Sequence, residues 1–398
     1  MSTTTTGPAT TTGPAKPYST IVREHLDRGV GVPRELYVSE PLFAAELDRI
    51  FRRSWLLAGH ESELADPGRY VTVESGDDSV IVTRTQEGTL AAFANVCRHR
   101  GARLVEAGCG ITRRRIVCPY HQWTYRLDGT LQGAPRMPDG FDPAEHPLPT
   151  AQVEVWHGLV FVNLAADPAE PLAGLLGTGE ELMRTFDLAG TRVAHTISYE
   201  VEANWKLVWE NAQECYHCSA NHPELLRTFD VGGLNQETYR ETELVASTDR
   251  RVQHARFPLR PGAVSLTFDG RYASGKPLGE FAGGLPPYTA SIHLKPTFAL
   301  VACPDYAVVL AERPLAVDRT EIRMSWLVRA DAVEGTDYDV DPLIKVWNET
   351  NIQDWALCER AQLGVRSRAY VPGPLSQDEE SVVDFYRSYA GLLEAGGL

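Results

Sequence analysis

The sequence predicts an α+β protein, in which a small all-β domain precedes a larger domain of helices packed against one antiparallel sheet. Three observations support this fold class. Short runs of β-type residues, broken by Gly, Asp and Pro, occupy residues 55–166. Strand-like and helical patterns then occur together in residues 167–398. A long helix candidate with apolar spacing, Pro342–Leu363, follows the last strand-like runs, so helices and strands share one domain.

The composition is that of a chain with real hydrophobic cores. It has 398 residues, of which 43% are hydrophobic, so we expect two or three domains that fold without disulfide support. The formal net charge of −15 argues against nucleic acid or an acidic membrane as partner, because both attract clustered Lys and Arg. Neither a long apolar run nor a leader-like N-terminus is visible, so we expect a cytoplasmic protein that binds small molecules and other proteins.

The first elements precede the β domain. Residues 1–17 form a Thr, Gly and Pro tract with little to bury, and we expect a disordered tail there. Apolar residues then recur at intervals of three and four within residues 18–54, as at Phe43, Leu47 and Ile50. This spacing predicts two short helices, which we expect to pack on the larger domain.

The β domain and the larger domain are predicted to meet at residues 166 and 167, where a Pro- and Gly-rich stretch, Asp167–Gly179, begins. A helical segment, Glu180–Phe186, then precedes a strand-like run, Val193–Val201, and Asn204 is a good N-cap for a second helix. The other apolar runs expected to form strands are Tyr70–Val73, Val80–Thr83, Leu90–Asn95, Gly158–Leu164, Tyr288–Leu294, Phe298–Ala302, Ala307–Leu310 and Ile322–Val328.

Two Cys–His pairs stand close together in the β domain. Cys97 and His99 belong to one predicted loop, and Cys118 and His121 belong to a second. Thiolate and imidazole ligands suit zinc or an iron–sulfur cluster. Structural zinc sites usually group two Cys and then two His, whereas a Rieske [2Fe–2S] centre binds one iron through two Cys and the other through two His. One Cys and one His in each loop favour the Rieske cluster, with zinc or incidental core residues as the alternatives.

A second group of candidate ligands follows Asn204. His217 and His222 are five residues apart, which on an ideal helix is about 140° beyond a full turn, so a regular helix could not present both to one metal. The helix must distort or end between them. Two His and one carboxylate form a facial triad that leaves positions open on Fe(II). Asp354 is the best candidate for the carboxylate, because a charge in an otherwise apolar helix needs a partner if it is buried; alone, it could be a solvated helix residue.

Together these motifs resemble the terminal oxygenases of the Rieske non-haem iron family, roughly over residues 20–395. The pattern C-x-H-R-G at Cys97–Gly101, followed by C-x-Y-H at Cys118–His121, carries the resemblance most strongly. It implies a Rieske domain followed by a helix-grip (START/Bet v1-like) catalytic domain. The implied ligands are Cys97, His99, Cys118 and His121 for the cluster and His217, His222 and Asp354 for the catalytic Fe(II). It further implies O2 as co-substrate, a flavin and iron–sulfur reductase that uses NAD(P)H, and a homotrimer in which one subunit's cluster serves its neighbour's iron.

One residue departs from the usual family pattern. Most members carry Asp three residues before the first iron-binding His, where it bridges to a cluster His across the subunit interface, but this chain has Glu214. A carboxylate is kept, so we assign Glu214 a part in catalysis through the orientation of the imidazoles. The segment E-C-Y-H-C-x-x-x-H-P-E-L, and Gln122 where many aromatic-ring dioxygenases have Gly, resemble the branch that oxidises glycine betaine, stachydrine and carnitine.

The branch resemblance implies hydroxylation of an N-methyl group and release of formaldehyde. Oxidation of an aromatic ring or aliphatic carbon of another metabolite is the alternative within the family. A Rieske-type electron carrier would account for the first ligand group alone, and a zinc-binding interaction module is the other reading without catalysis. Neither gives the second ligand group a purpose.

Other residues are predicted to have supporting roles. A cationic substrate needs an aromatic face or a carboxylate, and possible aromatic contacts are Tyr216, Tyr288, Phe298 and Tyr306. We expect Trp123 and Tyr125 to pack over the cluster, and His293 to be a sheet residue. Cys109 is predicted to be a spare thiol. Small buried apolar groups are the expected role of the remaining cysteines, Cys215, Cys218, Cys303 and Cys358.

Overall fold

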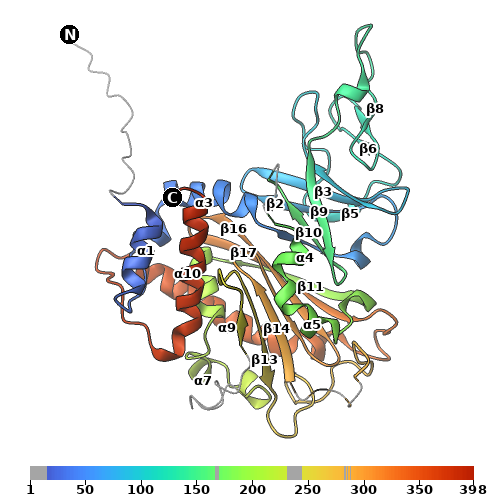
Figure 1. Cartoon of the computed structure of the whole chain (residues 1–398). Helices are drawn as coiled ribbons and strands as arrows, with labels where there is room; N and C mark the ends of the chain where they lie inside the picture. Colours follow the sequence, from blue (N-terminus) through green and yellow to red (C-terminus); the bar gives the residue numbers. More distant parts are fainter. Residues whose placement is uncertain (1–15, 166–169, 231–243, 282–283, 285, 287) are drawn as a thin grey trace, which may run out of the picture.

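In a computed structural model of the chain, the residues described are all except 1–15, 166–169, 231–243, 282–283, 285 and 287. Most of the expected disordered tail therefore lies outside the described residues. The chain forms two bodies, a β domain and a larger α+β domain (Figure 1). The short 3-10 turns that connect their elements are Phe51–Arg53, Glu61–Leu64, Pro143–Glu145, Gly177–Gly179, Leu188–Gly190, Leu225–Arg227 and Gln377–Glu379.

The N-terminal segment has three helices where the sequence predicted two. They are α1 (Tyr18–Leu26), α2 (Glu35–Val38) and α3 (Glu40–Arg49). Figure 1 shows α1 beside α10 (Glu380–Ala395), the last helix of the chain. Glu46 of α3 is fully buried and pairs with Lys206 at 2.8 Å, which fixes the segment to the larger domain.

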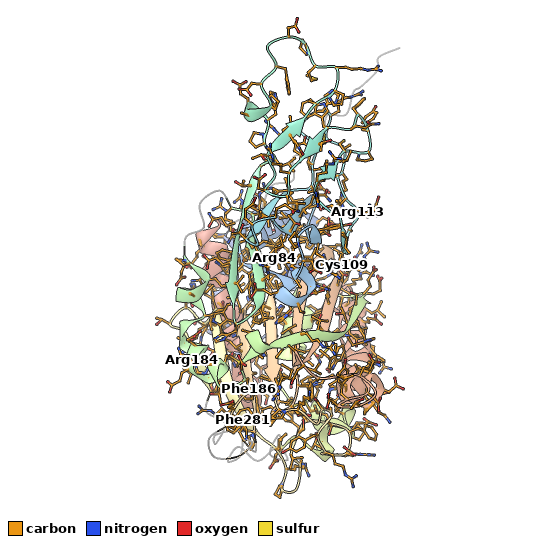
Figure 2. The ribbon with its side chains drawn as sticks, turned by 90° about the vertical axis from the view of Figure 1, so that its right-hand side faces the viewer. Arg84, Cys109, Arg113, Arg184, Phe186 and Phe281 are labelled. Atoms are coloured by element: carbon orange, nitrogen blue, oxygen red, sulfur yellow. A yellow bond between two sulfur atoms is a disulfide. The ribbon has the colours of Figure 1, made fainter. Side chains whose placement is uncertain are left out.

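The β domain contains two sheets. Seven antiparallel strands run in the order β1-β10-β9-β4-β3-β2-β5, and a three-stranded sheet in the order β6-β7-β8 stands at the far end of the domain (Figure 1). The strands are β1 (Leu56–His60), β2 (Arg69–Ser75), β3 (Asp78–Arg84), β4 (Leu90–Ala94), β5 (Cys109–Ile111), β6 (Ile116–Val117), β7 (Thr124–Tyr125), β8 (Leu131–Gly133), β9 (Thr150–Trp156) and β10 (Leu159–Asn163). The four strands predicted here are confirmed. Cys109 is exposed on the edge strand β5, outside the three-stranded sheet (Figure 2).

The larger domain is built on one seven-stranded antiparallel sheet. Its order is β11-β17-β16-β15-β14-β13-β12. The strands are β11 (Thr191–Val201), β12 (Val245–Ala246), β13 (Val252–Pro258), β14 (Tyr288–Leu294), β15 (Phe298–Ala302), β16 (Ala307–Ala316) and β17 (Arg319–Arg329). β16 and β17 are longer than the predicted apolar runs, because polar residues at their joined ends continue the pairing, as between Arg313 and Glu321.

Helices cover one face of this sheet. The long helix α9 (Val340–Val365) packs on β17 through a core that includes Leu343 and Trp326, and α6 (Trp205–Ala212) lies beside it. The opposite face packs against a core that also contains α4 (Leu172–Leu175) and α5 (Glu180–Arg184). Along β14 and β16, alternate residues face these two sides, so the space between the sheet and the helices can hold a cavity.

Candidate metal centres

The two loops that carry the first Cys and His pairs share one backbone pattern. The amide of each Cys donates to the carbonyl five residues on, at 2.9 Å for Cys97 and 2.8 Å for Cys118. The amide four residues on donates back to each Cys carbonyl, at 3.0 Å in both loops. That fourth residue is left-handed in both, with φ of +71° at Gly101 and +61° at Gln122. The repeated turn presents one thiol and one imidazole from each loop.

The four side chains form the set that a Rieske cluster needs. Cys97 and Cys118 are buried and neither is in a disulfide. The rings of His99 and His121 lie edge to face, with centroids 4.6 Å apart and an angle of 74° between the planes. The Nδ1 atom of His121 is buried and has no hydrogen-bond partner among the described residues, which is expected of an atom that binds a metal. The residues present therefore fit a [2Fe–2S] cluster held by two Cys and two His.

Aromatic side chains surround these ligands, as predicted. The Trp123 ring stacks on His99 at a centroid distance of 5.0 Å and an angle of 6°. The Tyr125 hydroxyl lies 3.4 Å from Cys97 Sγ and accepts a hydrogen bond from the Arg98 amide. The thiols are thus enclosed, whereas His99 is exposed and lies at the surface.

The second ligand group begins where α6 ends. The Asn204 side chain caps α6 by accepting from the Lys206 amide at 3.0 Å, which confirms its prediction as an N-cap. The next helix, α7 (Cys218–Asn221), is only four residues long, and His217 and His222 flank it. His222 has left the helical region, with φ of −123° and ψ of 63°. The helix ends between the two His, as their spacing required, and the Nε2 atoms of both rings come close together.

Asp354, on α9, supplies the third candidate ligand. The two Nε2 atoms of His217 and His222 lie 3.1 Å apart, and Asp354 Oδ1 lies 3.1 Å from the first and 2.9 Å from the second. Three cis ligands at about 2.1 Å from one metal are about 3.0 Å from each other. The donor set and its spacing therefore fit a facial triad for Fe(II).

Side-chain oxygen atoms orient both imidazole rings through hydrogen bonds to their Nδ1 atoms. His217 Nδ1 donates to Glu214 Oε1 at 2.5 Å, and His222 Nδ1 donates to Gln353 Oε1 at 2.7 Å. Each ring is thereby left with Nε2 directed at Asp354, the arrangement that supports metal-bound His in many sites. The Asn211 amide also donates to Asp354 Oδ1 at 3.2 Å. Gln353 and Asn211 were not predicted, although Gln353 directly precedes Asp354 and Asn211 lies six residues before His217.

The electrostatics of the triad favour a cation. Burial opposes a charge on His217, but hydrogen bonds to Asp354 and Glu214 outweigh burial and raise its pKa to about 9. Burial would raise the pKa of Asp354, yet hydrogen bonds from His217 and His222 lower it. Two carboxylates thus stabilise positive charge where the three donor atoms meet.

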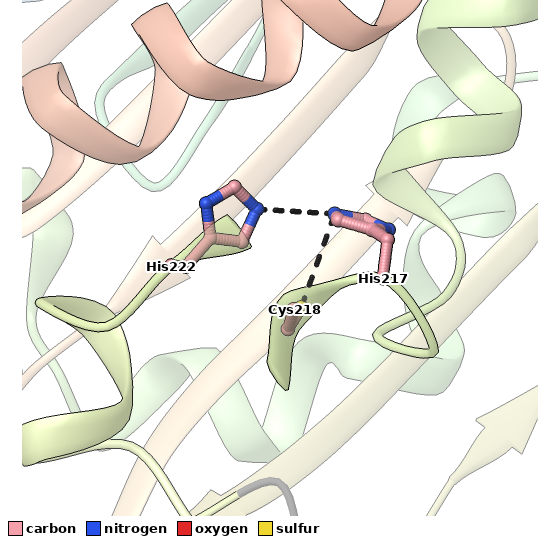
Figure 3. Close-up of side chains that lie close together, drawn as sticks. All are labelled: His217, Cys218 and His222. Carbon is pink, nitrogen blue, oxygen red and sulfur yellow. Dashed lines mark hydrogen bonds between the residues drawn. The ribbon is translucent and has the colours of Figure 1, made fainter. Parts of the chain in front are cut away.

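Cys215 and Cys218 are joined by a disulfide, and the expectation that they are separate apolar groups is wrong. The Cys218 amide donates to the Cys215 carbonyl at 3.1 Å, and this turn brings the two side chains together. Figure 3 shows Cys218 beside His217 and His222, with its sulfur 3.9 Å from His217 Nε2. The C-x-x-C spacing was the missed signal. Cys303 and Cys358 are buried and free, as predicted.

A cavity of about 210 Å³ opens beside the triad, between α9 and the sheet. Among the described residues, the aromatic side chains that line it are Trp209, Phe229, Phe257, Trp347 and Trp355. The four aromatic residues predicted to contact a cation are not among the lining residues. Tyr216 is 53% exposed, Phe298 and Tyr306 are buried within cores, and Tyr288 packs against a core on the other face.

His293 lies on β14, as predicted, and lines the same cavity. Its Nδ1 accepts a hydrogen bond from the Gln213 amide at 3.2 Å. Burial, together with the nearby Lys295, lowers the pKa of His293 to about 4, so its ring is neutral near pH 7. None of the described helices has the length and apolar character to cross a membrane.

Comparisons with known proteins match both bodies of the chain. A family model described as the Rieske [2Fe–2S] domain matches residues 54–154, and the catalytic domain of the ring hydroxylating alpha subunit matches residues 188–395. The glycine betaine monooxygenase oxygenase subunit of Pseudomonas aeruginosa is 36% identical, over 95% of this chain and 92% of its own length. The carnitine monooxygenase oxygenase subunit of Acinetobacter baumannii is 32% identical, over 60% of this chain and 64% of its own.

Solved structures share the fold. A quaternary ammonium Rieske monooxygenase in complex with L-carnitine superposes with a TM-score of 0.73 at 23% identity, covering 91% of this chain and 95% of that one. Naphthalene 1,2-dioxygenase from a Rhodococcus species bound to indole gives 0.74 at 20% identity, covering 94% and 98%. The predicted α+β architecture is confirmed.

Proposed function

The chain belongs to the Rieske non-haem iron oxygenases, as a ring-hydroxylating-type alpha subunit, and we propose that it N-demethylates a small quaternary ammonium compound such as glycine betaine. Membership of this family excludes both a Rieske-type electron carrier and a zinc-binding interaction module, because the catalytic domain matches in addition to the Rieske domain. The proposed domain boundary at residues 166 and 167 falls between the two matched regions.

We assign the ligands from the geometry described above. The four proposed cluster ligands are Cys97, His99, Cys118 and His121, and the three proposed iron ligands are His217, His222 and Asp354. When bound, the cluster supplies single electrons and the iron supplies activation of O2. Glu214 and Gln353 hold the His rings in the orientation that leaves Nε2 free, and the cavity beside the triad offers space for the substrate.

The observation that carries the substrate class is the aromatic lining of the cavity beside the triad. Trp and Phe faces attract a quaternary ammonium group by about 0.5–2 kcal/mol per contact, and they need no hydrogen from it. No Lys or Arg stands among the described residues that line the cavity. A small cation with methyl groups therefore suits the space better than an anion or a long apolar ring system.

The proposed reaction balances with two electrons from outside the chain. One N-methyl group of the quaternary ammonium substrate reacts with O2, two electrons and two protons to give an N-hydroxymethyl group and one water. The hydroxyl proton then leaves, its C–O bond becomes a carbonyl and the C–N bond breaks, which releases formaldehyde, the tertiary amine and that proton. We assign the electrons to a partner reductase that carries a flavin and oxidises NAD(P)H, in keeping with the oxygenase-subunit names of the relatives.

We further propose a homotrimer in which electrons cross between subunits. In Figure 1 the three-stranded sheet with the cluster loops lies at one end of the folded molecule, and the short helix α7 lies at the opposite end. His99 is exposed at one end, and Glu214 is 13% exposed beside the triad at the other. Contact between the exposed cluster loops of one subunit and the Glu214 region of the next would shorten the distance that an electron travels from the cluster to the iron.

The test is turnover by the purified chain with a generic reductase, NADH and O2. Betaines, free amines and aromatic compounds are offered in parallel, and formaldehyde and hydroxylated products are measured. Formaldehyde from glycine betaine or another methylated ammonium compound supports the proposal. Product from an aromatic compound, with every methylated amine inert, would overturn it in favour of ring hydroxylation while the family assignment stands.

A further inference from the structure

A buried carboxylate faces the cavity from the sheet. Glu312 lies on β16 and is 5% exposed. Leu310 and Glu312 line the cavity, whereas Val309 and Ala311, at the alternate positions, pack in the core on the other face. The alternation of the strand therefore directs the Glu312 side chain towards the space beside the triad.

Glu312 has no partner within the described part of the chain. Its Oε2 atom is buried without a hydrogen-bond donor, and no ion pair to this carboxylate is found among the described residues. Burial raises its pKa well above the ordinary value for Glu, and no group among the described residues opposes that shift, so the ionised form is favoured only when a cation lies beside it. A buried carboxylate without a partner is costly and rare in a folded protein, so its presence calls for a function.

The other carboxylates of the cavity are already bound. Within the described part of the chain, three acidic residues line it: Glu214, Glu312 and Asp354. Glu214 accepts from His217, and Asp354 contacts both His of the triad. Apart from His217 and His222, which already contact these two carboxylates, the described lining residues carry no positive charge, because they include no Lys or Arg and His293 is neutral. Among the described lining residues, Glu312 is the one carboxylate left to neutralise a charge on a bound molecule.

Nearby cations are held by other residues. The fully buried Lys206 pairs with Glu46, and the buried Lys295 donates to Gln253 Oε1 at 2.9 Å. Neither belongs to the lining of the cavity. Neither of these two Lys residues therefore neutralises Glu312, although both lie in or beside adjoining elements.

Glu312 and the triad lie on opposite walls of one space. Asp354 reaches the cavity from α9, and Glu312 reaches it from the sheet. Both are close enough to the Cys358 thiol, one helical turn after Asp354, for their charges to raise its pKa in addition to the effect of burial. The Trp209 and Trp355 rings line the cavity with them. A small molecule in this cavity contacts a carboxylate and aromatic faces while it lies beside the iron ligands.

We propose that Glu312 binds the positive charge of the substrate and so selects ammonium compounds over uncharged molecules of the same shape. This inference rests on the proposed function and assigns its selectivity to one side chain. A quaternary ammonium group has no N–H to donate, so the attraction is between charges across van der Waals contact, and it is stronger than in water because Glu312 is buried. The aromatic faces contribute to the same contact, but they attract neutral methyl groups as well.

The test compares two ligands that differ only in charge at one atom. Glycine betaine and 3,3-dimethylbutanoate have the same shape and the same carboxylate, with a positively charged nitrogen in the first and carbon in the second. Dissociation constants are measured by calorimetry on the iron-loaded protein without O2. The original chain is expected to bind glycine betaine at least about tenfold more tightly than its carbon analogue. Glu312→Gln keeps the shape of the side chain and is expected to remove most of that preference, by about 10- to 100-fold.

A matched variant controls for the loss of a Glu from the sheet. Glu321→Gln makes the same change on β17, at a position where the carboxylate pairs with Arg313 and does not line the cavity. It is expected to keep the preference for glycine betaine. The cluster spectrum and iron content show that each variant is folded and loaded.

The outcomes separate the inference from the function on which it rests. If the original chain prefers the cation and Glu312→Gln keeps that preference, the inference is overturned and the aromatic faces account for selectivity. If the original chain itself shows no preference for the cation, the quaternary ammonium assignment fails, whatever the variant does. Loss of the preference in Glu312→Gln alone supports the inference.

Discussion

The two ligand groups of this chain are built in opposite ways. The cluster ligands stand within Cys97–His121, on two loops that repeat the same backbone turn. In the triad, His217 and Asp354 are 137 positions apart and meet only because α9 packs beside α6. The first group depends on local turns and the second on tertiary packing. Changes at the triad should therefore leave the cluster intact, and changes in the loop turns should act on the cluster.

The largest effect is expected from Asp354→Ala. This change removes the ligand that comes from α9 and should lower turnover more than about 100-fold, because the mononuclear iron is lost. Metal analysis should show a fall from about three to about two irons per chain, with two acid-labile sulfides retained. The visible absorbance of the cluster should not change.

His217→Ala is a matched variant of the same site and should behave in the same way. Loss of the cluster absorbance in either variant would mean that the two metal sites have been confused or that they depend on each other for folding. A retained third iron in Asp354→Ala would exclude Asp354 as a ligand.

A smaller effect is expected when a residue that only holds a ligand is changed. Glu214→Gln replaces the carboxylate that accepts from His217 Nδ1 at 2.5 Å with an amide. Outer partners of metal-bound His typically contribute 10- to 100-fold to metal affinity or activity, so we expect a loss of about that size. The Fe(II) dissociation constant should be measured as well as turnover, since a role in electron transfer between subunits would change only turnover.

Glu224→Gln is the graded control for this prediction. Glu224 accepts from Gln353 at 3.2 Å, and Gln353 in turn holds His222, so Glu224 is one step further from the iron ligands. Its replacement should weaken Fe(II) binding by only a few-fold. Equal losses in the two Glu variants would contradict the view that Glu214 acts directly on a ligand.

The disulfide next to the triad should add stability to the larger domain alone. Replacing Cys215 and Cys218 with Ser opens a four-residue loop, and loop-closure entropy predicts a loss of about 2 kcal/mol in the free energy of unfolding. Urea unfolding followed by tryptophan fluorescence measures the loss, and dithiothreitol should lower the stability of the original chain to the same value. Cluster absorbance is the second probe and should keep its midpoint. A shift of that midpoint would show that the two bodies unfold together.

The contrast between local and distant construction also explains what the sequence could predict. The four cluster residues and the two His could be read from short motifs, because the turns that place them are local. Asp354 needed the resemblance as well, since nothing near it in the sequence indicates His217. Five of the seven strands in the sheet of the larger domain were predicted by their apolar runs, whereas β12 and β13 were not. The polar ends of β16 and β17 were missed because pairing with a neighbouring strand determines them.

The residues that line the cavity could not be predicted from the sequence. Tyr288, Phe298 and Tyr306 lie in or beside the predicted strands, but register and face decide which residues point at the triad, and these three do not. Glu312 was not predicted for the same reason. Its interest lies in the absence of a described partner, which no single-residue pattern can reveal. The disulfide, in contrast, had a visible signal, the C-x-x-C spacing, but we expected a chain that folds without disulfide support.

The smallest effect is expected within the repeated turn of the cluster loops. Gln122 has φ of +61° where the other loop has Gly101 at +71°. A left-handed conformation costs a residue with a Cβ about 1–2 kcal/mol, and Gly avoids this cost but loses about 0.4–1 kcal/mol of chain entropy. Gln122→Gly should therefore stabilise the β domain by about 0.5–1 kcal/mol, and Gly101→Ala should destabilise it by a similar amount. A Cβ at Gly101 meets no atom within 4 Å, so the second change tests backbone conformation without a clash. Thermal loss of the cluster absorbance measures both, and a less stable Gln122→Gly would show that the Gln side chain contributes more than its backbone costs.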